Sequence, residues 1–464
     1  MDGHYHAALA IAVFLITYVF IVSERFHRTV VALLGAVVLL LTGLITWDNA
    51  IHAIDFNTIG LLIGMMIIVG ITKNTGVFEY MAIKAAKMAG GEPLRILASI
   101  SLVTAILSAL LDNVTTVLLI VPVTFAITNK LKINPLPFLF AEILASNIGG
   151  TATLVGDPPN IMIGSATKLG FMDFVLTLAP VVVVIYILSI FWLHFLYRSQ
   201  LSTKKEMQSN IMQLNERDHI KDPQLMRKSL VVLVLTILGF VLHQYVHLES
   251  SIIALSGASL LLLITGEDVE HALQTVEWPV IFFFTGLFVV VGGLEEAGVI
   301  ESVANRALET TGGNLLLTGL LILWLSAMAS AFVDNIPFVA AMIPLIQDMG
   351  RLGGITELNL LWWSLSLGAC LGGNGTIIGA SANIIVVGLA EKRGHYISFM
   401  NYFKLAFPMM LMSIIISTGY LMFWHLYGHL LAAGFTLGLG VVLAVLSKPL
   451  KNLLIRSEGK ESKY

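Results

Sequence analysis

The six residues Ser108–Asn113, which read SALLDN, decide the fold because nearly the same six, SAFVDN, recur at Ser330–Asn335. Both copies interrupt long apolar stretches, Leu94–Ile127 and Asn314–Ile346. Each stretch is too long for one comfortable crossing of a bilayer, which takes about 20 apolar residues. Non-helical backbone at that depth must face protein or a watery cavity, because lipid cannot satisfy its N–H and C=O groups. We therefore expect two re-entrant hairpins with an Asp-Asn pair at each tip.

A second repeated segment follows each hairpin. Gly149–Asn160 (GGTATLVGDPPN) aligns with Gly372–Asn383 (GGNGTIIGASAN) at a shift of 223 positions, and the hairpin tips align at a shift of 222. The density of Gly, Thr, Asn and Pro predicts unwound backbone between two helix arms. Each half contains five predicted crossings, an odd number, so the halves must have opposite orientations. Inverted repeats with interrupted helices at matching positions are typical of secondary transporters, and the interruptions mark the binding site.

The composition is that of a polytopic, all-α membrane protein. Apolar residues make up 57% of the 464 positions and charged residues 12%, and the mean hydropathy is +0.89. A soluble domain has roughly 45–50% apolar and about 25% charged residues. The predicted crossings begin near Ala7, Val30, Phe56, Pro135, Phe174, Leu230, Ser251, Trp278, Leu360, Tyr402 and Leu430. This pattern predicts a first inverted repeat at 1–198, a cytoplasmic linker at 199–228, a second repeat at 229–427, an extra transmembrane helix at 428–447 and a cytoplasmic tail at 448–464.

The distribution of basic residues gives the orientation. With the N-terminus outside and the C-terminus in the cytoplasm, only Lys168, Arg306 and Arg351 of the 26 Lys and Arg residues lie outside. Arg25 and Arg28 then flank the first crossing on the cytoplasmic side. Such a bias is the positive-inside rule. We expect a multi-pass protein of the cytoplasmic (inner) membrane.

Asp112 and Asp334 are the first candidates for a functional role. A charged residue at the centre of a membrane helix costs roughly 2.5–3.5 kcal/mol, so a cation, a proton or the amides of a broken helix end must compensate it. A structural alternative is that each Asp only caps its hairpin turn. The Asn that follows in both copies favours cation coupling, because neutral oxygens beside a carboxylate are ligands for a hard cation.

Asp157 lies in the first interrupted segment but is matched by Ala380 in the second. It could carry a proton, or it could cap the helix that begins at Pro158, since Asp is a good N-cap and Pro suits the first turn. Asn160 and Asn383 could orient either substrate or backbone. The predicted substrate- or ion-binding residues are Asp112, Asn113, Thr115, Thr116, Asn147, Thr151, Thr153, Asp157, Asn160, Asp334, Asn335, Asn374, Thr376, Ser381 and Asn383. The proton-coupling candidates are Asp112, Asp334, Asp157 and Glu142.

These motifs resemble the ion transporter superfamily, in particular the tips Leu111–Thr116 and Val333–Pro337 with Gly156–Asn160 and Gly379–Asn383. Within it, the chain is similar to the arsenical-pump and NhaD-type permeases, a group that includes relatives of the melanosomal P protein. The resemblance implies a homodimer with fixed scaffold domains, in which the hairpins and broken helices move together as an elevator. It also implies two mirrored cradles, each built from one hairpin tip and the interrupted segment that follows it. A cytoplasmic ATPase can be a partner of arsenical-pump permeases.

The function expected from these features is proton-coupled efflux of arsenite or antimonite. The alternatives are Na+/H+ antiport, uptake of a small anion or carboxylate, and a channel. The dicarboxylate branch of the superfamily has Ser-Asn-Thr at its tips, where this chain has Asp, and extra negative charge opposes a polyanion. No buried Arg is expected to balance such a substrate. No cofactor, metal site, enzymatic motif or nucleic-acid partner is expected: the coupling ion is H+ or Na+, and the single Cys370 excludes a multi-thiolate metal site.

Overall fold

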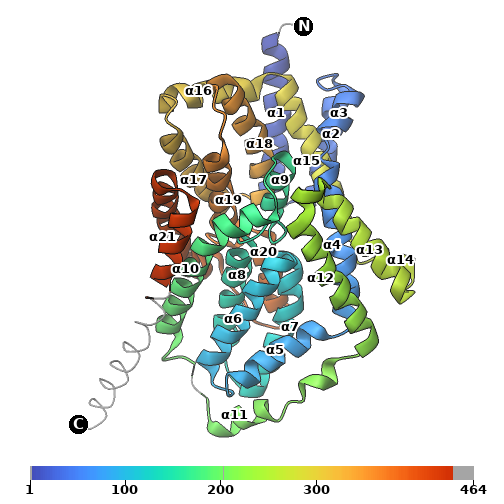
Figure 1. Ribbon diagram of the computed structural model, residues 1–464, viewed down its shortest axis with the longest axis vertical. Helices are drawn as coiled ribbons and strands as arrows, with labels where there is room; N and C mark the ends of the chain where they lie inside the picture. The colour runs from blue at the N-terminus through green and yellow to red at the C-terminus, as the bar shows by residue number, and fades with distance from the viewer. Residues whose placement is uncertain (1–2, 24, 202, 441, 443–464) are drawn as a thin grey trace, which may run out of the picture.

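The computed structural model describes residues 3–23, 25–201, 203–440 and 442, and its regular structure within these ranges is entirely helical (Figure 1). The first half contains α1 (Gly3–Ser23), α2 (Arg28–Leu41), α3 (Trp47–Ala53), α4 (Phe56–Asn74), α5 (Val77–Met88), α6 (Pro93–Leu110), α7 (Asn113–Leu131), α8 (Leu136–Gly150), α9 (Pro158–Ala166) and α10 (Phe171–Tyr197). The linker contains α11 (Lys205–Met212) and a 3-10 turn, η1 (Glu216–His219).

The second half continues with α12 (Pro223–Val246), α13 (Ser250–Thr265), α14 (Val269–Leu273), α15 (Trp278–Glu296), α16 (Val299–Thr311), α17 (Leu315–Phe332), α18 (Asn335–Gly353), α19 (Asn359–Gly372), η2 (Ile377–Gly379), α20 (Ser381–Glu391) and α21 (Phe399–Tyr427). A short apolar helix, His429–Gly440, follows. The predicted extra helix is thus described only in part, and the predicted tail at 448–464 lies outside the described residues.

The chain breaks at both Asp-Asn pairs, as predicted. Asp112 is the N-cap of α7 and accepts a hydrogen bond from the Thr115 amide at 2.7 Å, and Asp334 is the N-cap of α18 and accepts one from the Ile336 amide at 3.1 Å. A side-chain acceptor at this position satisfies an amide that the helix itself leaves free. The α6–α7 and α17–α18 pairs lie towards opposite ends of the molecule (Figure 1). Their opposite insertion into a membrane stays a prediction.

Helix lengths modify the expected span count. Nine helices of the described part are long and apolar enough to cross a membrane, and they include three of the four hairpin arms, α6, α7 and α17. The fourth arm, α18, has 19 residues but is not among the nine. Several predicted crossings are shorter: α2 has 14 residues and α13 has 16, and the broken helices α8 and α19 have 15 and 14. Length alone therefore does not separate a re-entrant hairpin from a pair of crossings, and re-entry stays a prediction.

Both predicted helix breaks are present, and glycines make them. A Cβ on Gly156 would lie 2.5 Å from the Gly150 carbonyl oxygen and 2.7 Å from the Ser108 carbonyl oxygen. In the second half, a Cβ on Gly379 would lie 2.7 Å from both equivalent carbonyl oxygens, those of Gly373 and Ser330. Only a residue without a side chain permits backbone to approach this closely. Each unwound segment thus packs directly against its own hairpin.

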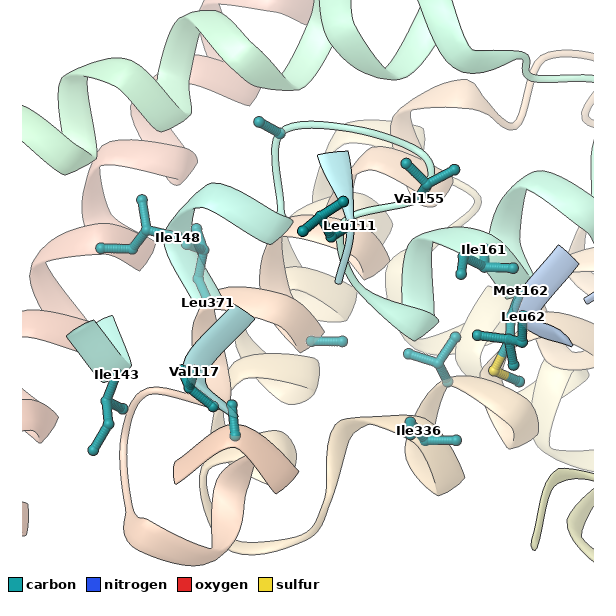
Figure 2. Packing of buried hydrophobic residues seen from close by; sticks show 14 of the residues in the cluster. Leu62, Leu111, Val117, Ile143, Ile148, Val155, Ile161, Met162, Ile336 and Leu371 are labelled. Atoms are coloured by element: carbon teal, nitrogen blue, oxygen red, sulfur yellow. The ribbon is translucent and has the colours of Figure 1, made fainter. Parts of the chain in front are cut away.

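The helices that carry these breaks occupy the centre of the protein. Every residue of α8 from Pro137 to Gly150 is buried, as is every residue of α19 from Leu360 to Gly372. Apolar side chains from both helices and from the hairpins surround the unwound segments, including Ile143, Ile148 and Leu371 (Figure 2). Any polar side chain on α8 or α19 must consequently find its partners inside the protein.

The first helices of each predicted half cover the other half. Helix α2 packs along α15, and α13 packs along α4. The Thr29 hydroxyl donates to the Pro279 carbonyl oxygen at 2.6 Å, and the Asn57 side-chain oxygen accepts from the Ser251 amide at 3.0 Å. The linker at 199–228 divides the sequence, but the packing is interlaced across it.

Candidate functional site

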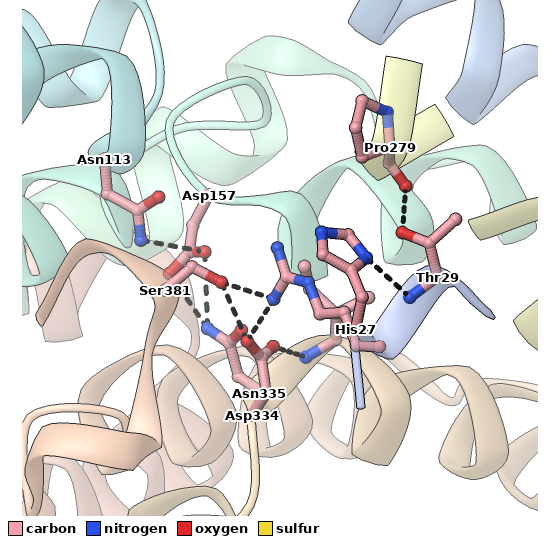
Figure 3. Close-up of polar contacts among 10 residues, drawn as sticks. His27, Thr29, Asn113, Asp157, Pro279, Asp334, Asn335 and Ser381 are labelled. Atoms are coloured by element: carbon pink, nitrogen blue, oxygen red, sulfur yellow. Dashed lines mark hydrogen bonds and ion pairs between the residues drawn. The ribbon is translucent and has the colours of Figure 1, made fainter. Parts of the chain in front are cut away.

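Asp157 lies between the two hairpin tips. Its Oδ1 accepts a hydrogen bond from Asn113 Nδ2 of the first tip at 3.3 Å and another from Asn335 Nδ2 of the second tip at 3.3 Å (Figure 3). The side chain is fully buried and makes no capping bond to α9, although Asp157 occupies the N-cap position of that helix. Of the two interpretations, the geometry favours a role at the tips, because the carboxylate is turned towards them.

A chain of carboxamides extends from Asp157 across the centre of the protein. Asn113 Nδ2 also donates to Asn147 Oδ1 at 3.2 Å, and Asn147 Nδ2 donates to Asn374 Oδ1 at 3.0 Å and to Asn383 Oδ1 at 2.9 Å. All four residues are buried. Because Asn147 belongs to the first half and its two acceptors to the second, these bonds connect the two broken helices directly.

Two polar atoms of the predicted site have no hydrogen-bond partner although they are buried. They are the hydroxyl oxygen of Thr116, in the first turn of α7, and the side-chain nitrogen of Asn374. An unpartnered buried polar group costs about 1–3 kcal/mol relative to a paired one. Such atoms are candidate contacts for a solute or ion, since binding would supply the missing partner.

Other predicted site residues hold the backbone. Asn160 Nδ2 donates to the carbonyl oxygens of Thr151 and Thr153 at 3.1 and 2.8 Å, and Asn383 Nδ2 donates to those of Gly373 and Thr376 at 2.7 and 2.9 Å. The hydroxyls of Thr153 and Thr376 donate to the carbonyls of Ala109 and Ala331, and the hydroxyl of Thr151 donates to the carbonyl of Asn147. The sequence left open whether Asn160 and Asn383 orient substrate or backbone, and in the structure both side-chain amides contact backbone carbonyls.

Asp334 forms an ion pair with Arg28, a partly exposed arginine at the start of α2. Arg28 Nη1 lies 2.9 Å from Asp334 Oδ2 and donates to the Ser381 hydroxyl at 2.7 Å, and that hydroxyl donates to Asp334 Oδ2 at 2.8 Å. The Arg28 side chain is 28% exposed and that of Asp334 10%. This ion pair was not predicted, because Arg28 flanks an apolar run and was interpreted only as a charge that flanks the first crossing, whereas α2 begins beside the second tip.

Asp112 has no such partner: within the described ranges, no Lys, Arg or His forms a salt bridge with it. Thr115, whose amide donates to Asp112, lines a cavity of about 390 Å³ together with Lys73, His271 and Glu277. Burial raises the pKa of Glu277, and the nearby Asp112 carboxylate raises it further, while Arg28 and Lys73 lower it. The sequence reasoning missed Glu277, which stands just before an apolar crossing like many interfacial residues.

Glu142 lies apart from this cluster. It is on α8 and 1% exposed; its Oε1 accepts from the Thr124 hydroxyl, and its Oε2 has no partner. None of the hydrogen bonds among the described residues joins it to Asp157 or to the carboxamides. Its predicted role in proton coupling stays a prediction.

Comparison with known proteins agrees with this architecture. Residues 18–368 match the family described as citrate transporter (CitMHS). An uncharacterized transporter of Mycobacterium bovis is 44% identical over 430 residues, which cover 92% of this chain and 100% of the relative. The P protein of Mus musculus is 34% identical over 90% of this chain and 60% of its own length.

One solved structure shares the fold. The YdaH transporter of Alcanivorax borkumensis aligns with a TM-score of 0.52 over 82% of this chain and 88% of that chain, at 14% sequence identity. At that identity the likeness concerns the fold alone. Taken with the family match over residues 18–368, these findings show that the chain is a membrane transporter of the citrate transporter family, within the ion transporter superfamily.

Proposed function

We propose that this chain is a secondary active transporter that exchanges protons for arsenite or antimonite and exports the metalloid across the cytoplasmic membrane. The observation that carries the proposal is the position of Asp157, a fully buried carboxylate held between both hairpin tips by neutral carboxamides. An ionisable residue inside a membrane protein is by default a functional candidate. Here one proton added or removed changes the charge at the point where the two halves meet.

The groups around Asp157 suit a small neutral hydroxide. Arsenite is uncharged near neutral pH, so it needs hydrogen-bond donors and acceptors but no counter-ion. The unpartnered Thr116 hydroxyl can donate or accept, and the unpartnered Asn374 amide can donate. A solute with several hydroxyls could satisfy both atoms while Asp157 carries the exchanged proton.

Two other substrates are each favoured by one observation. A small carboxylate is favoured by Arg28, which brings a guanidinium to the second tip, and by the description of the matching family as citrate transporter. The Arg28 charge is already balanced by Asp334, however, which weakens its attraction for an anion. Na+/H+ antiport is favoured by Asp112, whose carboxylate has no cationic partner in the described part of the chain.

Assembly and movement are part of the same proposal and rest on the family resemblance. The chain would form a homodimer, and the two hairpins with the broken helices would move as one elevator. The bonds from Asn147 to Asn374 and Asn383 support joint movement, because they tie the broken helix of one half to that of the other.

Everted membrane vesicles from cells that lack their own arsenite efflux system test the proposal. A pH-sensitive dye would report proton movement on addition of arsenite, Na+ or citrate in turn. We expect arsenite to trigger proton movement in the wild type and not in Asp157→Asn, because the amide cannot exchange a proton. Asp48→Asn, which removes an exposed carboxylate of α3, is the matched control and should behave like the wild type.

The other results each assign a different function. Proton movement on Na+ alone would make the chain a cation antiporter, and movement on citrate would make it a carboxylate transporter. Full proton coupling in Asp157→Asn would contradict the assignment of the proton to this residue, whichever solute is carried.

A further inference from the structure

We propose that Arg28 is the built-in counter-ion of the second hairpin tip, so that the coupling cation, H+ or Na+, is taken up at Asp112 and Asp157 and not at Asp334. The inference rests on the cation coupling proposed above, but it does not depend on which solute is carried. It assigns different roles to two aspartates that occupy equivalent positions of the repeat.

The contacts of Arg28 occupy one side of the Asp334 carboxylate. A single guanidinium nitrogen, Nη1, contacts both Asp334 Oδ2 and the Ser381 hydroxyl, and the hydroxyl donates to the same Oδ2. The other carboxylate oxygen, Oδ1, accepts from the Ile336 amide. Three of the roughly four acceptor positions of the Asp334 carboxylate are therefore occupied, and a cation that binds Oδ2 must displace Arg28 or Ser381.

Arg28 is held in place from the opposite side by a different part of the chain. Its guanidinium carbon lies 5.0 Å from the centroid of the Phe283 ring on α15, a distance at which a cation is attracted to the ring face. The next residue, Thr29, is bonded to the Pro279 carbonyl at the start of α15. The cation is thus presented by the α2–α15 pair, and not by the hairpin that carries Asp334.

The first tip has no equivalent arrangement. At the shift of 222 positions that relates the two tips, Arg28 corresponds to Ser250. At the shift of 223 positions that relates the interrupted segments, Ser381 corresponds to Pro158. Neither side chain can supply a positive charge. Asp112 accepts hydrogen bonds from the first turn of its own helix, chiefly from the Thr115 amide at 2.7 Å, and Glu277 adds a second carboxyl nearby. Lys73 and His271 line the same cavity as Thr115, but neither forms a salt bridge with Asp112 among the described residues. Of the two tips, the first is therefore the one whose aspartate has no ion-paired cation.

Thermal unfolding of the purified, full-length protein in detergent tests this inference without any transported solute. Unfolding would be followed in acidic and alkaline buffer, with either NaCl or choline chloride. We expect Arg28→Gln to unfold earlier than the wild type in alkaline choline buffer, because Asp334 then lacks a partner. Acid or Na+ should restore most of that loss, since the freed carboxyl takes up a proton or Na+. The cation concentration for half-maximal stabilisation should be lower than in the wild type by about tenfold, within the usual range of coupling between sites.

Four further variants locate the effect. Arg28→Lys keeps the positive charge and should respond to cations much as the wild type does. Arg28→Gln combined with Asp334→Asn should lose the added response, because no carboxyl is left at the second tip. In the wild-type background, Asp112→Asn should reduce the response to Na+ or acid, and Asp334→Asn should not.

The inference fails if Arg28→Gln and the wild type respond identically to acid and to Na+. It also fails if Asp334→Asn removes the cation response of the wild type, and this second result decides the matter even where Arg28→Gln does not fold. The unfolding experiment contains no transported solute, so a negative result in it does not bear on the vesicle experiment. Equally, absence of arsenite transport in vesicles does not bear on the role of Arg28.

Discussion

The hairpin and broken helix of the first half, α6 to α9, and those of the second half, α17 to α20, are alike in backbone and unlike in charge. Ser108 and Ser330 donate to the carbonyls of Ser146 and Ala369, each at 2.6 Å, and Asn160 and Asn383 each donate to two carbonyls of their own unwound segment. These bonds correspond at the shifts that the sequence repeat predicts, except that Asn160 donates to Thr151 whereas Asn383 donates to Gly373, one position before the residue equivalent to Thr151.

The charged groups do not correspond. Asp157 is matched by Ala380, Glu142 by Leu365 and Arg28 by Ser250. The two halves therefore share the glycines, hydroxyls and carboxamides that form the backbone contacts of the hairpin and the broken helix. The charged residues differ between the halves. Residues that are the same in both halves should therefore matter for folding in each half. Charged residues that occur in one half only should matter for ion coupling in that half.

The glycines of the cradle provide the largest expected effect. Gly156→Ala and Gly379→Ala each place a Cβ within 2.7 Å of two backbone carbonyl oxygens that cannot move aside. We expect both to lose about 3 kcal/mol or more of stability, seen as loss of monodisperse protein in size-exclusion chromatography. Gly388→Ala, which has nothing within 4 Å, is the control and should fold normally. If only one of the two variants folded normally, the claim that the two halves have equivalent backbone packing would be wrong.

The paired serines should give a smaller and equal effect. Ser108→Ala and Ser330→Ala each remove one buried hydrogen bond to a backbone carbonyl, which should cost about 1–3 kcal/mol. Thermal unfolding of the two variants should shift to the same extent. Exposed Ser302, bonded only to a carbonyl of its own helix, is the control, and its replacement by Ala should change stability by less than about 0.5 kcal/mol. Clearly unequal shifts would mean that the two cradles are not equivalent.

Glu142 should give the smallest change in stability. Because its carboxyl is buried with one unpartnered oxygen, an ionised form would be costly and the neutral form is expected. Glu142→Gln keeps the shape and the neutral charge, so unfolding should change by less than about 1 kcal/mol. Proton movement in vesicles then separates two roles. Slower movement at unchanged stability assigns Glu142 to the proton path, whereas unchanged movement makes it a structural partner of Thr124.

Much of the fold and part of the site could be predicted from the sequence. The helix breaks at the Asp-Asn pairs and in the Gly-rich segments could be predicted, because they depend on local properties: Asp caps a helix, and glycine allows the backbone to approach a neighbour closely. The contact of Asp157 with the second tip could not be predicted, since it depends on how two segments 178 residues apart in the chain meet. The ion pair of Arg28 could not be predicted for the same reason: Asp334 is 306 positions away, and the distribution of charge along the sequence does not reveal such a contact.

The interlaced packing of α2 on α15 and of α13 on α4 has a consequence for biosynthesis. Helix α2, with only 14 residues, is made long before α15 emerges from the ribosome. Until then it lacks the surface that covers it and the partner of Arg28, and domains are generally completed in the order of their synthesis. The nascent chain must therefore be kept partly assembled at the insertion machinery, and the second half completes the first as it arrives.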